Sequence, residues 1–155
     1  MGMVYSETLA PELDSNDSNT SYADTISTVV SSLKEDAAYE SHGEGQGHTW
    51  KFDYGTVQVF VHLTGENSDD TLSVWSSVLT LPARDEAQLF RTLLEKSWIE
   101  TLEARFSIWN DQVVLNHFRT LEGLTAAEIS RAITIVATLA DEYDEPLIQA
   151  HGNPA

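Results

Sequence analysis

The sequence predicts an α+β domain: an antiparallel five-stranded sheet with helices packed on it, in the order α-β-β-β-α-β-β-α. Two observations predict this class. Residues 81–144 contain a Leu-Pro pair followed by helix, strand, tight-turn, strand and helix patterns. Residues 20–80 contain one helical pattern and then strand-like runs in which apolar and polar side chains alternate, as in half-buried strands.

The first half of the chain supplies one helix and three strands. Apolar residues at helical spacing predict a helix over residues 22–39, with Ser21 as its N-cap. Alternating apolar residues then predict strands at residues 50–52, 57–63 and 71–80. The last of these runs is apolar on both faces, so we expect it to be central in the sheet or to lie under a subunit contact.

The second half supplies two helices around a hairpin. We expect a helix over residues 84–98, strands at 104–108 and 113–118, and a final helix that starts at the N-cap Thr125 and ends before Pro146. The expected buried face of the first of these helices comprises Leu89, Phe90, Leu93 and Leu94.

Composition divides the chain into one domain and two tails. Residues 1–20 are acidic and poor in apolar groups, so we expect a disordered tail, although such a segment can also order against a partner. We expect a single α+β domain over residues 21–145 and a flexible C-terminal tail over residues 146–155.

The charge of the chain restricts its partners. The 8 Lys and Arg residues stand against 25 Asp and Glu residues, for a formal net charge of −17. A nucleic-acid-binding protein needs a basic face, and an anionic membrane surface attracts basic proteins. We therefore expect neither nucleic acid nor membrane as a partner. The acidity either steers basic partners toward the protein or serves solubility alone.

The chain contains no cysteine. This excludes a disulfide scaffold, a thiol nucleophile, a zinc–thiolate site and an iron–sulfur cluster, and it fits a reducing compartment. Residues 1–19 lack the basic and apolar regions of a secretory signal, and no run approaches the roughly 20 apolar residues of a membrane span. We therefore expect a cytoplasmic protein.

Six short motifs suggest a family. They are Leu81-Pro82, Leu93-Leu94-Glu95, Ala104-Arg105-Phe106, Asp111-Gln112-Val113-Val114-Leu115, Arg119-Thr120-Leu121-Glu122-Gly123-Leu124 and Glu128-Ile129. In this order and spacing they resemble the YbjN-like proteins of bacteria and plastids. The resemblance covers residues 22–143, and the chain looks like the cyanobacterial and plant branch.

The YbjN-like family is similar to the small acidic chaperones that accompany type III secretion effectors. Those chaperones share the predicted element order, form homodimers and hold extended effector segments. The resemblance therefore implies this fold and a homodimer, and it brings no catalytic residues. Many relatives carry Asn where this chain has Ser97, so the resemblance gives no support for a polar role at that helix end.

The candidates for chemistry are isolated residues. His42, Glu44 and His48 share a glycine-rich loop, which suits either a labile transition-metal site or a solvated loop. His62 and His117 lie in strands and would need an orienting carboxylate to act as general bases. There is no Gly-x-Ser-x-Gly elbow and no phosphate-binding loop. We therefore expect no catalytic residue, no cofactor and no metal.

The aromatic residues are more informative, because they exceed what one face of a small sheet needs. We expect a partner or dimer surface, with the alternative that both sheet faces are covered within one subunit. The candidate residues of this surface are Phe60, Trp75, Trp98, Trp109 and Phe118.

Taken together, these features favour a non-enzymatic, chaperone-like or adaptor homodimer that binds a protein or peptide segment. Two alternatives remain open. One is a regulatory or scaffold protein that binds no client. The other is a small-molecule enzyme, assisted by a metal at His42 and His48.

Overall fold

The computed structural model describes residues 20–43 and 46–153. Apart from Thr20, the expected N-terminal tail lies outside these residues. The elements, in chain order, are α2 (Tyr22–Leu33), β1 (Ala38–Ser41), β2 (His48–Tyr54), β3 (Val57–Leu63), β4 (Thr71–Thr80), α3 (Glu86–Ile99), β5 (Arg105–Trp109), β6 (Gln112–Thr120) and α4 (Ala126–His151).

The strands form one sheet in the order β1-β2-β3-β4-β6-β5, and every neighbouring pair is antiparallel. The α+β class and the antiparallel sheet agree with the sequence prediction. The two-sided apolar strand β4 is central, since it pairs with β3 on one side and β6 on the other. The predicted number of strands was wrong, because the sheet has six and not five.

The additional strand is β1, which the sequence pattern placed at the end of the first helix. The helix α2 ends at Leu33, and Lys34 already has an extended backbone, with φ −154° and ψ 117°. Beyond it, Ala38 and Tyr39 pair with β2, and the ring of Tyr39 lies 5.3 Å from that of Trp50. Pairing with the sheet therefore overrides the helical pattern of these last residues.

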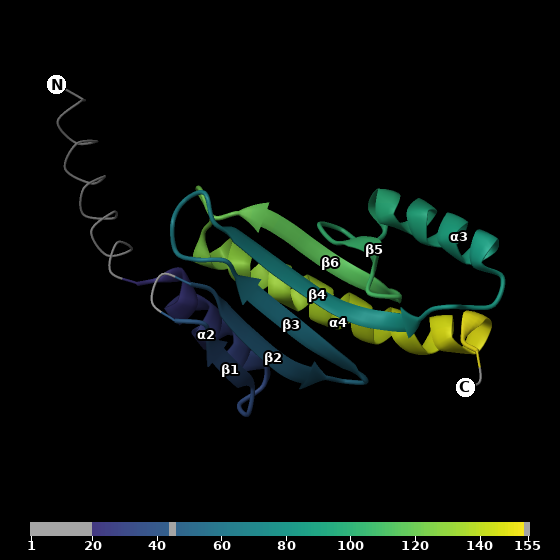
Figure 1. The fold of residues 1–155 in the computed structure, drawn as a ribbon, viewed down its shortest axis with the longest axis horizontal. Coiled ribbons are helices and arrows are strands. Elements are labelled where there is room, and N and C mark those ends of the chain that lie inside the picture. The colour runs from purple at the N-terminus through teal and green to yellow at the C-terminus, as the bar shows by residue number, and fades with distance from the viewer. Residues whose placement is uncertain (1–19, 44–45, 154–155) are drawn as a thin grey trace, which may run out of the picture.

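The helices leave one face of the sheet uncovered (Figure 1). The long helix α4 packs across β2, β3, β4 and β6, and α2 packs beside it on β2. An indole hydrogen bond joins the two layers there, because Trp50 Nε1 donates to Ser27 Oγ at 3.0 Å. The third helix, α3, lies at the β5 edge (Figure 1). Within the described residues, no helix packs on the opposite face of β2, β3 and β4.

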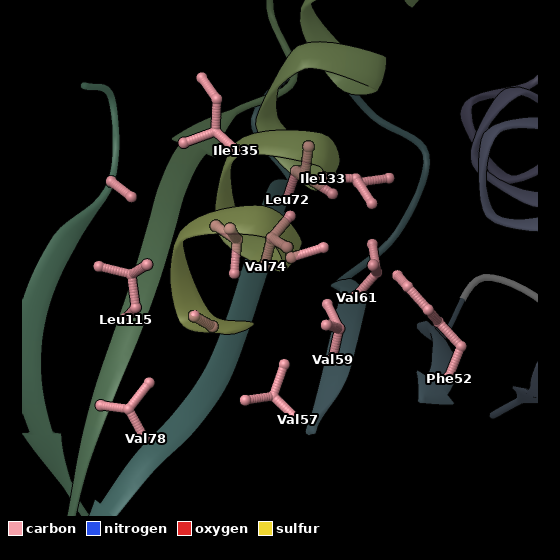
Figure 2. Close-up of a cluster of buried hydrophobic side chains, with 14 of the residues drawn as sticks. Phe52, Val57, Val59, Val61, Leu72, Val74, Val78, Leu115, Ile133 and Ile135 are labelled. Carbon is pink, nitrogen blue, oxygen red and sulfur yellow. The ribbon is translucent and has the colours of Figure 1, made fainter. Parts of the chain in front are cut away.

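The core fills the space between the sheet and α4 (Figure 2). Alternate residues of β3 and β4 point into it, and the inner face of α4 closes it. Each fully buried aliphatic side chain contributes roughly 1.5–3 kcal/mol. The central members are Val59, Val61, Leu72, Val74, Leu115 and Ile133, all at most 1% exposed.

The helix α4 is longer than predicted. Thr125 caps its first turn as expected, since Thr125 Oγ1 accepts the backbone N–H of Glu128 at 3.2 Å. However, Pro146 lies inside the helix, which continues to His151, so residues 146–151 are not a flexible tail. Pro146 is exposed, and contacts further along hold the helix end in place. In particular, His151 Nδ1 bonds the Arg84 carbonyl at 2.8 Å, and Asn153 Nδ2 donates to the Pro82 carbonyl at 2.7 Å.

In residues 20–43 and 46–153, no helix combines the length and apolar character needed to cross a membrane.

Candidate binding surfaces

The uncovered face of the sheet carries aromatic side chains on four strands. Phe60 on β3 pairs in register with Trp75 on β4, and their rings are stacked at 5.2 Å with an interplanar angle of 11°. Trp109 on β5 meets Trp75 edge-on, at 6.2 Å and 67°. Phe118 on β6 pairs with Ser73, two residues from Trp75 along β4 and on the same face. We call Phe60, Trp75, Trp109 and Phe118 the aromatic platform.

The platform follows from strand alternation. Because successive side chains of a strand point to opposite faces, the valines of β3 enter the core while Phe60 and His62 face outward. The same alternation places Phe118 outside, where its side chain is 62% exposed, and Trp109 is 59% exposed. Large apolar groups with this exposure are available to a partner.

A hollow of about 440 Å³ opens on the platform. The indoles of Trp75 and Trp109 line it, together with polar groups from four strands. Two of these polar groups hold each other in place, since Ser107 Oγ donates to Asn116 Oδ1 at 2.7 Å. The other two polar contributors, Ser73 and His62, come from the β4 and β3 side. The surface therefore mixes aromatic faces with hydrogen-bonding groups.

A chain of hydrogen bonds joins His42, Thr49 on β2 and His62 on β3 at one corner of the uncovered face. The hydroxyl of Thr49 lies 3.0 Å from His42 Nε2 and 3.0 Å from His62 Nδ1. Burial lowers the pKa of His62 below its usual value of 6.5, and the nearby His42 lowers it further. A lowered pKa favours the neutral imidazole. This corner therefore presents His62 to the hollow as an uncharged group near neutral pH.

The histidines of the glycine-rich loop do not converge. His42 joins Thr49 on the uncovered face, whereas His48 faces the helix side, where its Nδ1 lies 2.8 Å from the Tyr39 hydroxyl and its ring stacks near Trp50. Glu44 lies outside the described residues. Among the residues that the structure does describe, no three His, Asp or Glu side chains form a group suited to a metal ion.

The strand histidines have structural contacts. His62 contacts the Thr49 hydroxyl, and His117 Nδ1 lies 3.0 Å from the carbonyl oxygen of Glu103. Neither of these contacts involves a carboxylate, which a general base of the kind considered from the sequence would need to orient it.

A second apolar surface lies on α3 and its surroundings. The predicted buried face of α3 is half right, because Leu89 and Leu93 are buried and Phe90 is partly buried, whereas Leu94 is 70% exposed. Trp98 is 83% exposed on this helix and is not part of the platform. The large exposed residues here are Leu94, Trp98, Ile99, Leu102 and Ile108, which we call the edge surface.

Ser97 fastens α3 to the sheet edge. Its side chain is buried, and its Oγ accepts the backbone N–H of Phe106 on β5 at 3.0 Å. A buried backbone amide without a partner is costly, so this contact secures both elements. Sequence reasoning missed this role. The available signal was the position of Ser97, four residues after Leu93 on the buried stripe of the helix.

Residues 22–149 match the sequence model of the YbjN protein family, which is described as "Putative bacterial sensory transduction regulator". The chain belongs to the YbjN family. The match runs from the first residue of α2 into the last turn of α4, so it includes both candidate surfaces. The assignment to the cyanobacterial and plant branch stays a prediction. Comparison with curated proteins gives no match.

Among solved structures, this YbjN-family chain is similar to a chain in the crystal structure of the ExsC–ExsE complex. The TM-score is 0.55 at 16% sequence identity, and the superposition covers 81% of this chain and 96% of that chain. At this level of identity the likeness shows the fold. It agrees with the chaperone-like architecture expected from the sequence.

Proposed function

We propose that this YbjN-family protein is a non-enzymatic, chaperone-like or adaptor homodimer that binds an extended protein segment on the uncovered face of its sheet. The observation that carries the proposal is the aromatic platform. The core is complete on the helix side of the sheet, yet four strands place large aromatic groups on the other side. Those groups add nothing to the core.

The composition of the platform suits a protein partner. Aromatic side chains are enriched among the residues that dominate binding energy at protein interfaces. Beside them, Ser73, Ser107 and Asn116 offer hydrogen-bonding groups at the hollow. Such groups can pair with the backbone of an extended segment, while the aromatic faces bury its side chains. The solved structure with a similar fold, that of the ExsC–ExsE complex, contains two different proteins bound to each other, which is consistent with this use of the fold.

The edge surface supplies the subunit contact in this proposal. It is apolar at its centre, where Trp98 and Leu94 stand one helical turn apart on α3. Ion pairs flank it on the same helix, between Arg91 and Glu95 and between Lys96 and Glu100. An apolar centre with a charged rim is the usual anatomy of an interface. In a two-fold homodimer the same patch from each subunit meets itself.

An aggregation assay tests the proposal. Thermally unfolded citrate synthase is mixed with an equimolar amount of the full chain, and light scattering follows its aggregation. We expect suppression by the native chain and loss of suppression in the double variant Trp109→Ser, Phe118→Ser. The control is Ile148→Ser, which removes an exposed apolar residue of α4 outside both surfaces. Equal activity of the platform variant and the control would refute the proposal.

A second candidate is a regulatory or scaffold protein without client binding. The observation that favours it is the description of the family as a sensory transduction regulator. Such a protein would form the dimer through the edge surface and would not suppress aggregation at all. The same assay therefore separates the two candidates. The metal-assisted enzyme is disfavoured, because His42 and His48 lie on opposite faces of the sheet.

A further inference from the structure

The hollow on the platform has the shape of a half-open aromatic cage. Trp75 and Trp109 stand at 67° to each other with ring centroids 6.2 Å apart, so their indoles form two adjoining walls. Phe60 stacks against Trp75 and supports the first wall from β3. The hollow that these two walls border has a volume of about 440 Å³, which is enough space for one long side chain of a bound segment.

We propose that this hollow receives a cationic side chain, arginine in the first place, from the protein segment that binds the uncovered face. The inference rests on the proposed function and names the residue type that the site selects. The faces of indole rings carry negative electrostatic potential and attract a cation within about 6 Å of the ring centroid. A planar guanidinium can stack on one such face while its edges reach polar groups.

The polar groups of the hollow fit a guest that only donates hydrogen bonds. A guanidinium has N–H donors and no acceptor. The hollow offers oxygen atoms from Ser73, Ser107 and Asn116. Asn116 Oδ1 already accepts the Ser107 hydroxyl at 2.7 Å, which fixes the direction of both side chains and leaves a second lone pair on the amide oxygen.

The charges around the hollow favour a cation. None of its lining residues is Lys, Arg, Asp or Glu, and the chain as a whole carries a net charge of −17. Arg105 stands beside Asn116 in the strand register, but its Nη1 donates to its neighbour's carbonyl, that of Ala104, at 2.7 Å. On the far side of Phe60, Lys51 lies on β2, outside the lining. The lining of the hollow itself therefore contains no Lys or Arg, whereas an anion would enter a strongly acidic protein.

The protonation of His62 provides a second test of the site. Its imidazole lines the hollow, and burial and the neighbouring His42 lower its pKa. The other titratable groups around it are His48, whose backbone contact raises that pKa and whose charge lowers it by less, and Glu40 and Lys51, which share its face of the sheet by register. Acidification protonates His62 and places a positive charge in the hollow, so a cationic guest should bind more weakly at low pH.

The test uses matched peptides and the full chain. The probes are two acetylated, amidated pentapeptides of sequence Thr-Ser-Xaa-Ser-Thr, in which Xaa is arginine or citrulline. Citrulline keeps the shape of arginine and lacks its charge. The chain has four Trp residues, whose indole N–H signals report binding by NMR titration. We expect the arginine peptide to shift the Trp75 and Trp109 signals and to bind roughly 2- to 30-fold tighter than the citrulline peptide.

Two variants locate the effect. Trp109→Leu removes one wall of the cage at an exposed position and should abolish the preference for arginine. Trp98→Leu changes an exposed indole on α3, away from the hollow, and should leave the preference intact. Equal affinity for the two peptides, or a preference that survives Trp109→Leu, would overturn the inference. Platform-dependent suppression of aggregation alongside equal peptide affinities would leave the proposed function standing, so the two failures are distinguishable.

Discussion

The platform and the edge surface are both exposed and apolar, yet they are built differently. The platform consists of aromatic groups on strands, at positions fixed by the register of the sheet, with hydroxyl and amide groups between them. The edge surface consists mainly of aliphatic groups around Trp98, on one helix and the loop and strand beside it, with ion pairs at its rim. A mixed surface can pair with an extended backbone, whereas a uniformly apolar one suits a permanent contact.

The largest expected effect is a difference in unfolding free energy between substitutions on the buried and the exposed side of α3. Leu93 is buried beneath the edge surface, and its neighbour Leu94 is part of that surface. Leu93→Ala should lower the free energy of unfolding by roughly 2–5 kcal/mol, because it leaves a cavity in the core. Leu94→Ala should leave the stability of the monomer nearly unchanged. Urea unfolding at low protein concentration measures both. Similar losses in the two variants would mean that α3 is oriented differently.

The next effect concerns the dimer. Trp98→Glu places a charge in the proposed subunit contact and should weaken self-association about 30-fold or more, the size expected for a central interface residue. Light scattering across a dilution series gives the mass. Trp109→Glu, on the platform, serves as the matched control and should remain dimeric. A monomeric control with a dimeric Trp98→Glu variant would exchange the roles of the two surfaces.

A smaller effect tests how the edge surface is held. Ser97→Ala removes the acceptor for the buried Phe106 amide and should cost about 1–3 kcal/mol of unfolding free energy. Ser97→Asn keeps a side-chain oxygen that can accept this hydrogen bond, so it should recover most of the loss. Thermal or urea unfolding checks the pair. If both variants match the native chain, the Ser97 contact does not secure α3.

The smallest expected effect is the pH dependence of stability that arises from His62, which contacts Thr49 beside the platform. The pKa of His62 is lower in the folded protein than its ordinary 6.5, so the unfolded chain takes up the proton first as the pH falls. The stability linked to His62 is therefore full above about pH 6.5 and declines as the pH drops toward the folded-state pKa. His62→Gln should flatten this decline. Unfolding free energies measured from pH 8 to 5 in both proteins give the comparison, and parallel curves would contradict it.

The sequence predicted the parts of the fold in which local pattern and burial agree. The alternation in β3 and the cap at Thr125 are visible in one stretch of chain, and both are confirmed. The strand β1 was missed because its residues continue a helical pattern, and only pairing with β2 makes them extended. Pro146 was misread because a proline usually ends a helix, while here contacts from His151 and Asn153 hold the helix end beyond it.

The candidate surface was predictable in composition but not in arrangement. Alternation alone places Phe60 and Phe118 opposite the valine faces of their strands, as the structure does. The sequence could not assign Trp98 to a different surface from the other aromatic residues, since its position depends on how α3 packs at the β5 edge. The stacking of Phe60 on Trp75 depends on strand register, which a single sequence does not specify.

Site-specific photo-crosslinking tests the central claim, that the uncovered sheet face binds a protein segment while the edge surface binds a second copy. Phe118 and Trp98 are replaced in turn by the photoreactive p-benzoylphenylalanine, and each variant is irradiated with unfolded citrate synthase. We expect crosslinks to the client from position 118 and to a second copy of the chain from position 98. Crosslinks to the second copy from position 118, or to the client from position 98 alone, would contradict it.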